Sequence, residues 1–306
     1  MLIFLIRRFI QIIPVLLGVT LIVFLIMQMV PGDPAALVAG EGATDAQVDS
    51  IRHELGLDQP VLVQYAKYVG DVVQGDLGES IRTSRPVLDE ILVRLPITLE
   101  LAFWSILITV ILGVIIGIIA ATKQNSFTDV GLMMVALLGV SLPNFWLGLI
   151  LILYFSVELQ WFPVAGLGTF SHIILPALTL GTGGAAIVAR MTRASMLEVI
   201  RQDYIRTAKA KGVRQRFIIY KHALKNALIP VITVVGLQFG ALLGGTVLTE
   251  SVFAINGVGR LIIDAIRMRD LPLVQGTILF VSVLFVLVNL LVDVSYRFLN
   301  KRVELN

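Results

Sequence analysis

The sequence predicts an all-α integral membrane protein with six transmembrane helices and a small helical region outside the membrane between the first and second helix. The composition is the first observation: 57% of the 306 residues are hydrophobic and 15% are charged, whereas soluble domains are about 45–50% apolar and about 25% charged. The second is a series of apolar stretches long enough to cross a bilayer. The third is the uneven distribution of Lys and Arg between the segments that connect them.

The apolar stretches set the number of spans. A transmembrane helix needs roughly 20 predominantly apolar residues. Six stretches qualify, namely residues 9–30, 101–122, 130–157, 173–189, 227–249 and 271–292. Pro143 lies near the middle of the third stretch, which predicts a kinked or tilted helix there. The fourth stretch is short and rich in glycine, so its limits are the least sharply defined.

The basic residues predict the orientation. Arg7 and Arg8 precede the first span, and residues 190–226 carry ten basic residues against two acidic ones. Residues 31–95 carry eleven acidic residues against five basic ones. Short cytoplasmic connections are enriched in Lys and Arg. We therefore expect both termini and residues 190–226 in the cytoplasm, and the connection between the first two spans outside.

The outer connection contains signals for three short helices. Thr44 and Gln47 have the spacing of a capping box, and Gly56 would end the helix that they begin. Pro60 suits the first position of a second helix, and a third would cover residues 86–95. A plain helical cap and a docking surface for an outside partner are both compatible with this pattern. The chain is thus predicted to divide into a first span, an outer region and a transmembrane core at residues 1–30, 31–99 and 100–306.

Polar residues inside the spans are few and uncharged. Four of them are candidates for lining a translocation path: Ser141, Asn144, Gln238 and Asn289. Each could instead form a hydrogen bond between helices. Glu250 and the other charged residues near the spans lie at span ends, which argues against the buried ionisable relay of a proton-driven carrier. The sequence also lacks the G-x-x-x-x-G-K-[ST] pattern that would cradle ATP phosphates.

Two glycine patterns predict close helix packing. Gly236, Gly240 and Gly244 form a stripe at every fourth position of the fifth span, and Gly113 and Gly117 repeat this spacing in the second. Such stripes let another helix approach closely. Packing within the chain is the better interpretation for the second span. For the fifth span, a contact with a second membrane subunit competes with it.

The segment DYIRTAKAKG, residues 203–212, predicts a short cytoplasmic helix. An acidic residue begins it, lysines lie near its end, and Gly212 would stop it. Tyr204, Ile205 and Ala208 fall on one face. A basic segment alone would suit anionic lipid. A small alanine between an aromatic residue and a glycine turn favours insertion into a groove of another protein.

Nine stretches of the chain resemble the dipeptide, oligopeptide and nickel permease family, which are membrane subunits of binding-protein-dependent ABC importers. The resemblance covers nearly the full length. In chain order the matching stretches are PGDP (31–34), GLDQP (56–60), GDLG (75–78), RMTRASMLEV (190–199), DYIRTAKAKG (203–212), HALKNALIP (222–230), GVGRLIIDAI (257–266), RDLPLVQG (269–276) and LVNLLVDVSY (287–296). The helix at 203–212 is similar to the cytoplasmic coupling helix of such subunits, with Arg206-Thr207-Ala208 where the general importer pattern has Glu-Ala-Ala.

The resemblance implies a permease subunit in a bacterial cytoplasmic membrane. Its cargo would be di- or oligopeptides, with glutathione as a further candidate. The partners would be a second, homologous permease subunit, two ATP-binding subunits and an extracytoplasmic substrate-binding protein. ATP and Mg²⁺ would be bound by the partner ATPases, and this chain would carry no cofactor, metal site or catalytic residue and bind no nucleic acid. The residues implied in coupling to the ATPase are Asp203, Tyr204, Ile205, Arg206, Thr207, Ala208 and Gly212.

Three other interpretations remain open. Within the family, the cargo could be nickel or a nickel chelate, although no cluster of His or Met lines a span. A membrane scaffold that holds cytoplasmic partners through residues 190–226 would move no cargo. An intramembrane enzyme would need a nucleophile with a base or a metal at bilayer depth, and the sequence offers none.

Overall fold

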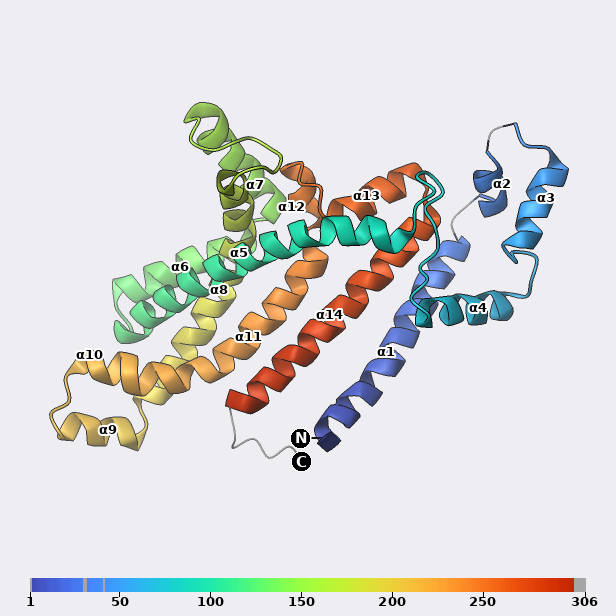
Figure 1. Ribbon diagram of the computed structural model, residues 1–306. Helices are drawn as coiled ribbons and strands as arrows, with labels where there is room; N and C mark the ends of the chain where they lie inside the picture. Colours follow the sequence, from blue (N-terminus) through green and yellow to red (C-terminus); the bar gives the residue numbers. More distant parts are fainter. Residues whose placement is uncertain (1, 30–31, 41, 300–306) are drawn as a thin grey trace. The chain divides into compact units, whose positions relative to one another are not determined.

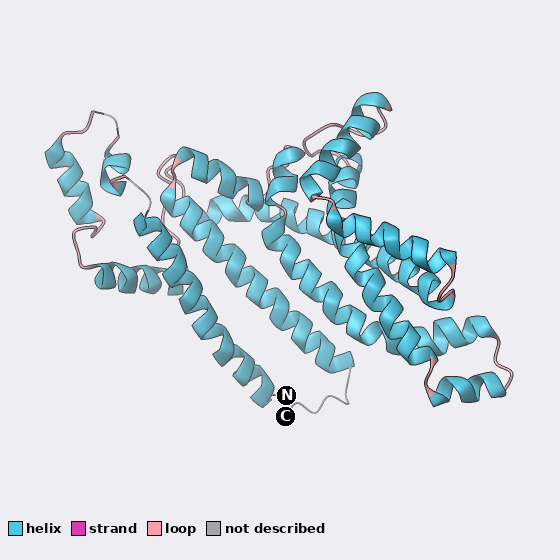
Figure 2. Cartoon of the chain, turned by 180° about the vertical axis from the view of Figure 1, so that it is seen from behind, coloured by secondary structure: helices cyan, strands magenta, loops and turns pink. Residues whose placement is uncertain are grey.

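The computed structural model describes residues 2–29, 32–40 and 42–299, and in this part of the chain the structure is helical (Figures 1 and 2). A single isolated β-bridge joins Glu79 and Pro86 within the described residues. The helices are α1 (Leu2–Met29), α2 (Pro34–Ala39), α3 (Asp45–Glu54), α4 (Val61–Val73), α5 (Val87–Thr122), α6 (Phe127–Ser141), α7 (Asn144–Leu151), η1 (Ile152–Glu158, a π-helix), α8 (Phe170–Ile200), α9 (Asp203–Ala210), α10 (Gln215–Phe217), η2 (Ile218–Ala223, a π-helix), α11 (Leu224–Gly245), α12 (Val247–Val252), α13 (Val258–Met268) and α14 (Leu271–Leu299).

The all-α, multi-span fold predicted from the sequence is confirmed. Five helical segments are long and apolar enough to cross a membrane, and the count reaches six if α6 and the following α7–η1 segment form one span. These last two segments meet at an angle of 102°. The five are Ile10–Met29, Val87–Thr122, Phe170–Ile200, Gln215–Gly244 and Leu271–Val292.

The bend expected at Pro143 is a complete break of the helix. Leu142, which precedes the proline, has φ −82° and ψ 130°, and Pro143 itself caps the start of α7. Proline disfavours helical dihedrals in the residue before it and has no N–H to donate. The chain therefore turns sharply between Ser141 and Asn144 rather than tilting as one long helix.

Two predicted helix limits are wrong. The separate helix expected over residues 86–95 is the first part of α5, which continues through Pro96. The fourth span is α8, which extends eleven residues beyond the expected end at 189, from an apolar segment into a polar one. In each case the helix continues where the local composition changes, because packing on neighbouring helices stabilises it more than residue propensity does.

Two compact units make up the chain, one from Met1–Pro96 with Gly257–Val286 and the other from Ile97–Asn256 with Leu287–Asn306. The first unit has an apolar core of α5, α13 and α14 residues, namely Val87, Ile91, Val258, Leu261, Ala265, Leu273 and Val274. Beside this core, the buried carboxylate of Asp270 accepts a hydrogen bond of 2.5 Å from Ser80 Oγ and another from the Ile81 N–H. The loop before α5 is thereby fixed to the start of α14.

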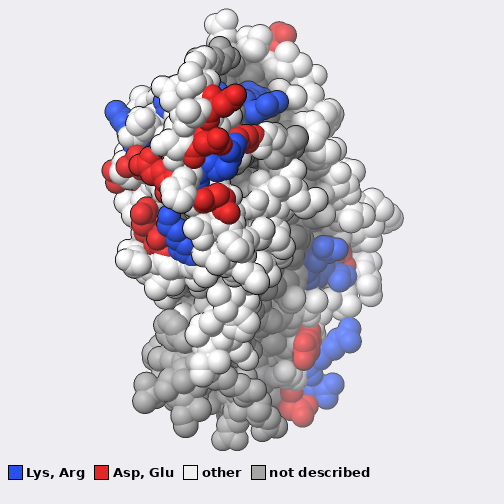
Figure 3. Space-filling model, turned by 90° about the vertical axis from the view of Figure 1, so that its right-hand side faces the viewer, with Lys and Arg blue, Asp and Glu red and all other residues white. Residues whose placement is uncertain are grey.

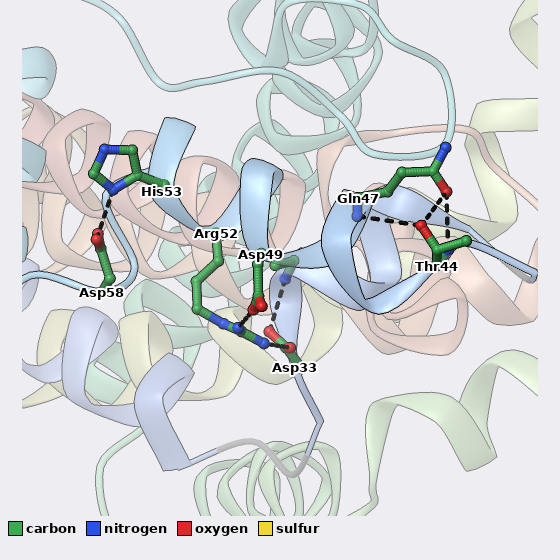
Figure 4. A network of polar contacts seen from close by, with 8 residues as sticks. Asp33, Thr44, Gln47, Asp49, Arg52, His53 and Asp58 are labelled. Atoms are coloured by element: carbon green, nitrogen blue, oxygen red, sulfur yellow. Dashed lines mark hydrogen bonds and ion pairs between the residues drawn. The ribbon is translucent and has the colours of Figure 1, made fainter.

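Short-range capping shapes α2 and α3, also in the first unit. The predicted capping box is present: Thr44 Oγ1 accepts from the Gln47 N–H, and Gln47 Oε1 accepts from the Thr44 N–H. Gly56 has φ +70° just after α3. Arg52 donates to Asp33 at 2.5 Å and also to Asp49, which links α3 to the N-cap of α2 (Figure 4). Charged side chains of both signs gather on the face these helices present (Figure 3).

The exposed His53–Asp58 pair at the end of α3 predicts a pH dependence. His53 Nδ1 lies 2.7 Å from Asp58 Oδ2 (Figure 4). This hydrogen bond raises the pKa of His53 above its ordinary value of 6.5 and lowers the pKa of Asp58 below 3.8. The pair therefore stabilises the end of α3 at pH values between the lowered pKa of Asp58 and the raised pKa of His53. The His53 contribution is lost as the pH rises through the raised pKa, and the Asp58 contribution as the pH falls through the lowered one.

An NMR titration of the His53 imidazole checks this expectation, with the resonance assigned through a His53→Gln variant. The pKa of His53 should fall towards 6.5 in an Asp58→Asn variant, because the amide keeps the shape of the side chain without its charge. An identical His53 titration in the wild-type protein and in Asp58→Asn would show that the pair does not form.

Candidate coupling site

The short helix α9 is held on the second unit by one buried side chain. Ile205 is fully buried. It packs in an apolar group, here named the anchor cluster, to which α5, α8, η2 and α11 also contribute. The cluster consists of Ala121, Met196, Val199, Ile205, Ile218, Ala223 and Ala227. Because burial of an isoleucine side chain is worth about 1.5–3 kcal/mol, Ile205 supplies a firm attachment for a helix of only 8 residues.

The end of α9 follows the sequence prediction. Gly212 has φ +74°, a conformation that favours glycine. The Gly212 N–H donates to Lys209 O at 3.0 Å, and the Val213 N–H donates to Ala208 O at 3.2 Å. These two bonds form a Schellman motif, which satisfies carbonyls at the helix end and turns the chain back. The α10–η2 segment consequently returns beside α9 (Figures 1 and 2).

Hydrogen bonds of Tyr204 join α9 to η2 and α11, and a further hydrogen bond joins α11 to α8. The Tyr204 hydroxyl accepts from Asn226 Nδ2 at 2.8 Å and lies 3.4 Å from the His222 carbonyl oxygen, to which it donates. Ser195 Oγ of α8 donates to Ala227 O of α11 at 2.9 Å. These bonds and the anchor cluster thus connect α9 to the ends of both α8 and α11.

The structure corrects the expected position of Ala208. Ala208 lies on the inner side of α9, half-buried against the anchor cluster, so it is not the centre of an exposed docking face. One helical turn separates Ile205 from Ala208, which places both on the side that packs against the chain. Besides Tyr204, whose hydroxyl bonds to α11, the exposed residues of α9 are Asp203, Arg206, Thr207, Lys209 and Ala210. The Asp203–Arg206 ion pair at 3.5 Å is open to solvent, so it adds little to stability.

Two of the four candidate path residues flank the break in the third span. Ser141 is the last residue of α6, and its Oγ donates to Leu137 O at 2.9 Å. Asn144 is the first residue of α7, and its Oδ1 lies 3.4 Å from the place where a Cβ on Gly183 would stand. Both side chains are exposed on this chain. They remain available to a path or to a neighbouring subunit.

The other two candidates lie on different helices. Gln238 is half-buried on α11, with its Nε2 3.3 Å from the Cβ position of Gly184 on α8. Asn289 is on α14, and its Oδ1 is buried without a hydrogen-bond partner among the described residues. No hydrogen bond joins any two of the four candidates in the described part of the chain. The structure therefore brings Ser141 and Asn144 together but not the whole set.

The glycines pack helices against each other within the second unit. A Cβ on Gly236 would lie 2.4 Å from both γ-carbons of Val292, so α11 and α14 touch there. Gly240 is buried and Gly244 is exposed. Cβ atoms on Gly113 and Gly117 would lie 2.6 Å and 2.5 Å from the Cβ atoms of Val188 and Thr192 on α8. A contact of the Gly236 stripe with a second subunit stays a prediction.

Sequence reasoning missed a buried ion pair between α6 and α8. Arg193 Nε donates to Asp129 Oδ1 at 2.7 Å, and Arg193 Nη2 donates to Asp129 Oδ2 at 2.7 Å. The Asp129 side chain is 3% exposed. In the sequence, Ser126 and Asp129 have the spacing of a helix start, and the Ser126 side chain does cap α6. That local explanation accounts for Asp129 and conceals its partner 64 residues away.

A second buried carboxylate lies at the start of α12. Glu250 is fully buried, and its Oε1 accepts hydrogen bonds of 2.9 Å from both Thr98 and Thr246. The sequence correctly places Glu250 at a span end. One of these hydroxyl donors, Thr98, lies on α5, 152 positions away, and the other, Thr246, directly precedes α12.

Comparison with solved structures shows which known fold the chain resembles. A chain of the MetNI methionine ABC transporter in an inward-facing conformation matches with a TM-score of 0.60 and 19% identity, over 71% of this chain and 100% of that one. An amino acid ABC transporter crystallised with histidines matches with a TM-score of 0.51 and 15% identity, over 71% and 95% of the two chains. At these identities the likeness is one of fold, shared with chains of ABC transporters.

Sequence comparison then defines the family. Residues 1–102 match the N-terminal part, and residues 113–305 the main part, of the binding-protein-dependent transport system inner membrane component. The chain belongs to this family and is a multi-pass inner-membrane permease subunit. It is 46% identical to the dipeptide transport system permease protein DppB of Alkalihalophilus pseudofirmus, over 99% of this chain and 100% of that protein. It is 48% identical to the glutathione transport system permease protein GsiC of Escherichia coli K12, over 99% of both.

Proposed function

We propose that this chain forms half of the path through which an ATP-driven importer takes up dipeptides or similarly small peptides such as glutathione. Membership of the family implies a substrate-binding protein and an ATPase as partners. In our proposal a conformational change of the ATPase displaces α9, and this displacement moves the spans.

The two-sided arrangement of α9 is the observation that carries this proposal. Ile205 fixes the inner side in the anchor cluster, while Asp203, Arg206, Thr207 and Ala210 leave the outer side open. A partner that grips the outer side can therefore push or pull α8 and α11 through the inner side. A helix that only anchored the chain to anionic lipid would need its positive charge but not this apolar attachment.

The proposed assembly has this chain paired with a second, homologous permease subunit and two ATP-binding subunits. ATP and Mg²⁺ bind to those partners, and this chain holds no cofactor. Both termini and residues 190–226 face the cytoplasm, where α9 meets the ATPase, and the binding protein docks outside, on the side of α2–α4. The excess of basic residues in 190–226 and of acidic residues in 31–95 supports this orientation.

The proposed cargo follows from the relatives and agrees with the candidate path residues. Two relatives with 46% and 48% identity over almost the whole chain are named as dipeptide and glutathione permeases. The candidate path side chains Ser141, Asn144, Gln238 and Asn289 are neutral and polar. Such groups can hydrogen-bond a peptide backbone as it passes without holding a charge so strongly that release is slow.

Transport by the purified complex tests this function. The permease, with the partners that co-purify with it, is placed in liposomes with its binding protein and ATP on opposite sides. We expect accumulation of a labelled dipeptide or of labelled glutathione that needs both ATP and the binding protein. Liposomes with a non-hydrolysable ATP analogue are the control. Accumulation of Ni²⁺ in place of both peptides would identify the family's other cargo, and no accumulation of any of the three would contradict an importer function.

A further inference from the structure

The ion pair between the buried Asp129 and the half-buried Arg193 lies between the anchor cluster and the broken third span. Arg193 is on α8, one turn before Met196, which is fully buried in the anchor cluster with Ile205. Asp129 is in the first turn of α6, which runs from there to the break at Ser141. The pair thus joins α8, which packs with α9 in the anchor cluster, to α6, which ends at the candidate path residue Ser141.

The contact has the geometry of a two-point attachment. Two guanidinium nitrogens of Arg193 each meet a different oxygen of Asp129 at 2.7 Å. The Asn125 N–H donates a further hydrogen bond of 3.0 Å to Asp129 Oδ2. A bidentate arginine–carboxylate pair fixes direction as well as distance. We expect rotation or sliding of α8 to be passed to the start of α6, because separation would leave the Asp129 carboxylate, whose side chain is 3% exposed, without its charged partner.

The far end of α6 also touches α8, but through weaker contacts. A Cβ on Gly139 would lie 3.4 Å from the Thr182 carbonyl oxygen, an ordinary van der Waals distance. After the break, α7 packs through Gly148 against Phe253 and Thr179. The charged attachment of α6 to α8 is thus at its Asp129 end, and near its Ser141 end the two helices meet through van der Waals contacts.

We propose that Asp129 and Arg193 are positioning residues that transmit displacement of α9 to the break between Ser141 and Asn144. This inference rests on the proposed function, since it assigns the route by which ATP hydrolysis moves the path. It assigns the pair no contact with cargo or nucleotide.

Apolar replacement of both partners separates this role from simple stabilisation. An Asp129→Leu/Arg193→Met double variant keeps the volume of the site and removes both charges, a change that often leaves stability intact or improves it. We expect normal assembly with the partner subunits, continued ATP hydrolysis, and at least a tenfold fall in dipeptide imported per ATP hydrolysed. Arg190→Gln removes an exposed basic residue one turn away on α8 and should keep the wild-type ratio.

A covalent rescue provides the second test. The chain has no cysteine, so an Asp129→Cys/Arg193→Cys double variant carries its only thiols at the two positions. Before cross-linking it should show the same low ratio of import to hydrolysis. A short bis-thiosulfonate linker between the two thiols should restore the ratio severalfold, which a merely structural role would not predict.

The outcomes distinguish the positioning role of Asp129 and Arg193, here called the link, from the importer function. Wild-type import per ATP in the Leu/Met variant, or in the Cys/Cys variant without the linker, would overturn the proposed link and leave the importer function standing. A Cys/Cys variant that the linker does not restore would also overturn it. Absence of import by the wild-type complex would contradict the proposed function. In that case the link is judged by the ATPase alone, whose stimulation by the binding protein should be lost in the Leu/Met variant and kept in Arg190→Gln.

Discussion

An Ile205→Asp variant is expected to lose peptide uptake almost completely while its spans still insert into the membrane. Ile205 is fully buried in the anchor cluster. Even truncation of such a side chain to alanine costs about 2–5 kcal/mol, and a buried carboxylate without a partner costs more. α9 itself is only 8 residues long, and isolated helices of that length are unstable in water. Detached from the cluster, it should therefore unfold as well as move.

Limited digestion with trypsin measures the detachment directly. Lys209 and Lys211 lie at the end of α9, and cleavage after them should become at least about tenfold faster in Ile205→Asp, because proteolysis tracks the opened population. Arg206→Ala is the matched control, since it loses an exposed ion pair of 3.5 Å and should leave cleavage after the lysines unchanged. Normal uptake by Ile205→Asp would show that α9 does not carry the coupling.

The anchor cluster also explains why the sequence analysis expected Ala208 to face a partner. The period of the helix correctly puts Tyr204, Ile205 and Ala208 on one face. Whether that face meets a partner or the chain's own core depends on Met196, Ile218 and other residues of the anchor cluster. Those residues are distant in sequence, and local periodicity contains no information about them.

Local signals were reliable where the physical cause is local. The capping box at Thr44 and Gln47, and the end of α9 before Gly212, follow from hydrogen bonds between residues a few positions apart. The number of spans follows from the length of apolar segments and the thickness of a bilayer. These features require no knowledge of tertiary contacts.

The remaining features depend on long-range packing. The polar end of α8 stays helical because Met196 and Val199 are buried against other helices. The partnership of Asp129 with Arg193 spans 64 positions, and each residue has an adequate local explanation. Proline at position 143 predicted a bend, but its angle is set by the packing of α7 on α8 through Gly148 and Thr179.

Gly117 lies where α5 contacts α8. A Gly117→Ala variant should strongly reduce the amount of folded permease. The added Cβ would lie 2.5 Å from Thr192 Cβ and 2.8 Å from the Ala189 carbonyl oxygen. The Ala189 oxygen is a backbone atom and the Thr192 Cβ is bonded directly to the backbone, so neither can move aside and the helices must separate. Overpacking of this kind costs about 1–3 kcal/mol or more. The half-life of the detergent-solubilised protein at a fixed temperature measures the loss.

Gly131→Ala is the matched control, because no atom lies within 4 Å of a Cβ at that position on α6. In a helix, alanine is favoured over glycine by about 1 kcal/mol. The same chemical change should therefore be neutral or stabilising at Gly131 and destabilising at Gly117. Equal half-lives for the two variants would mean that α5 and α8 do not approach as closely as the structure shows. The close approach at Gly117 and the ion pair at Arg193 both involve α8, so loosening this helix should impair coupling as well as folding.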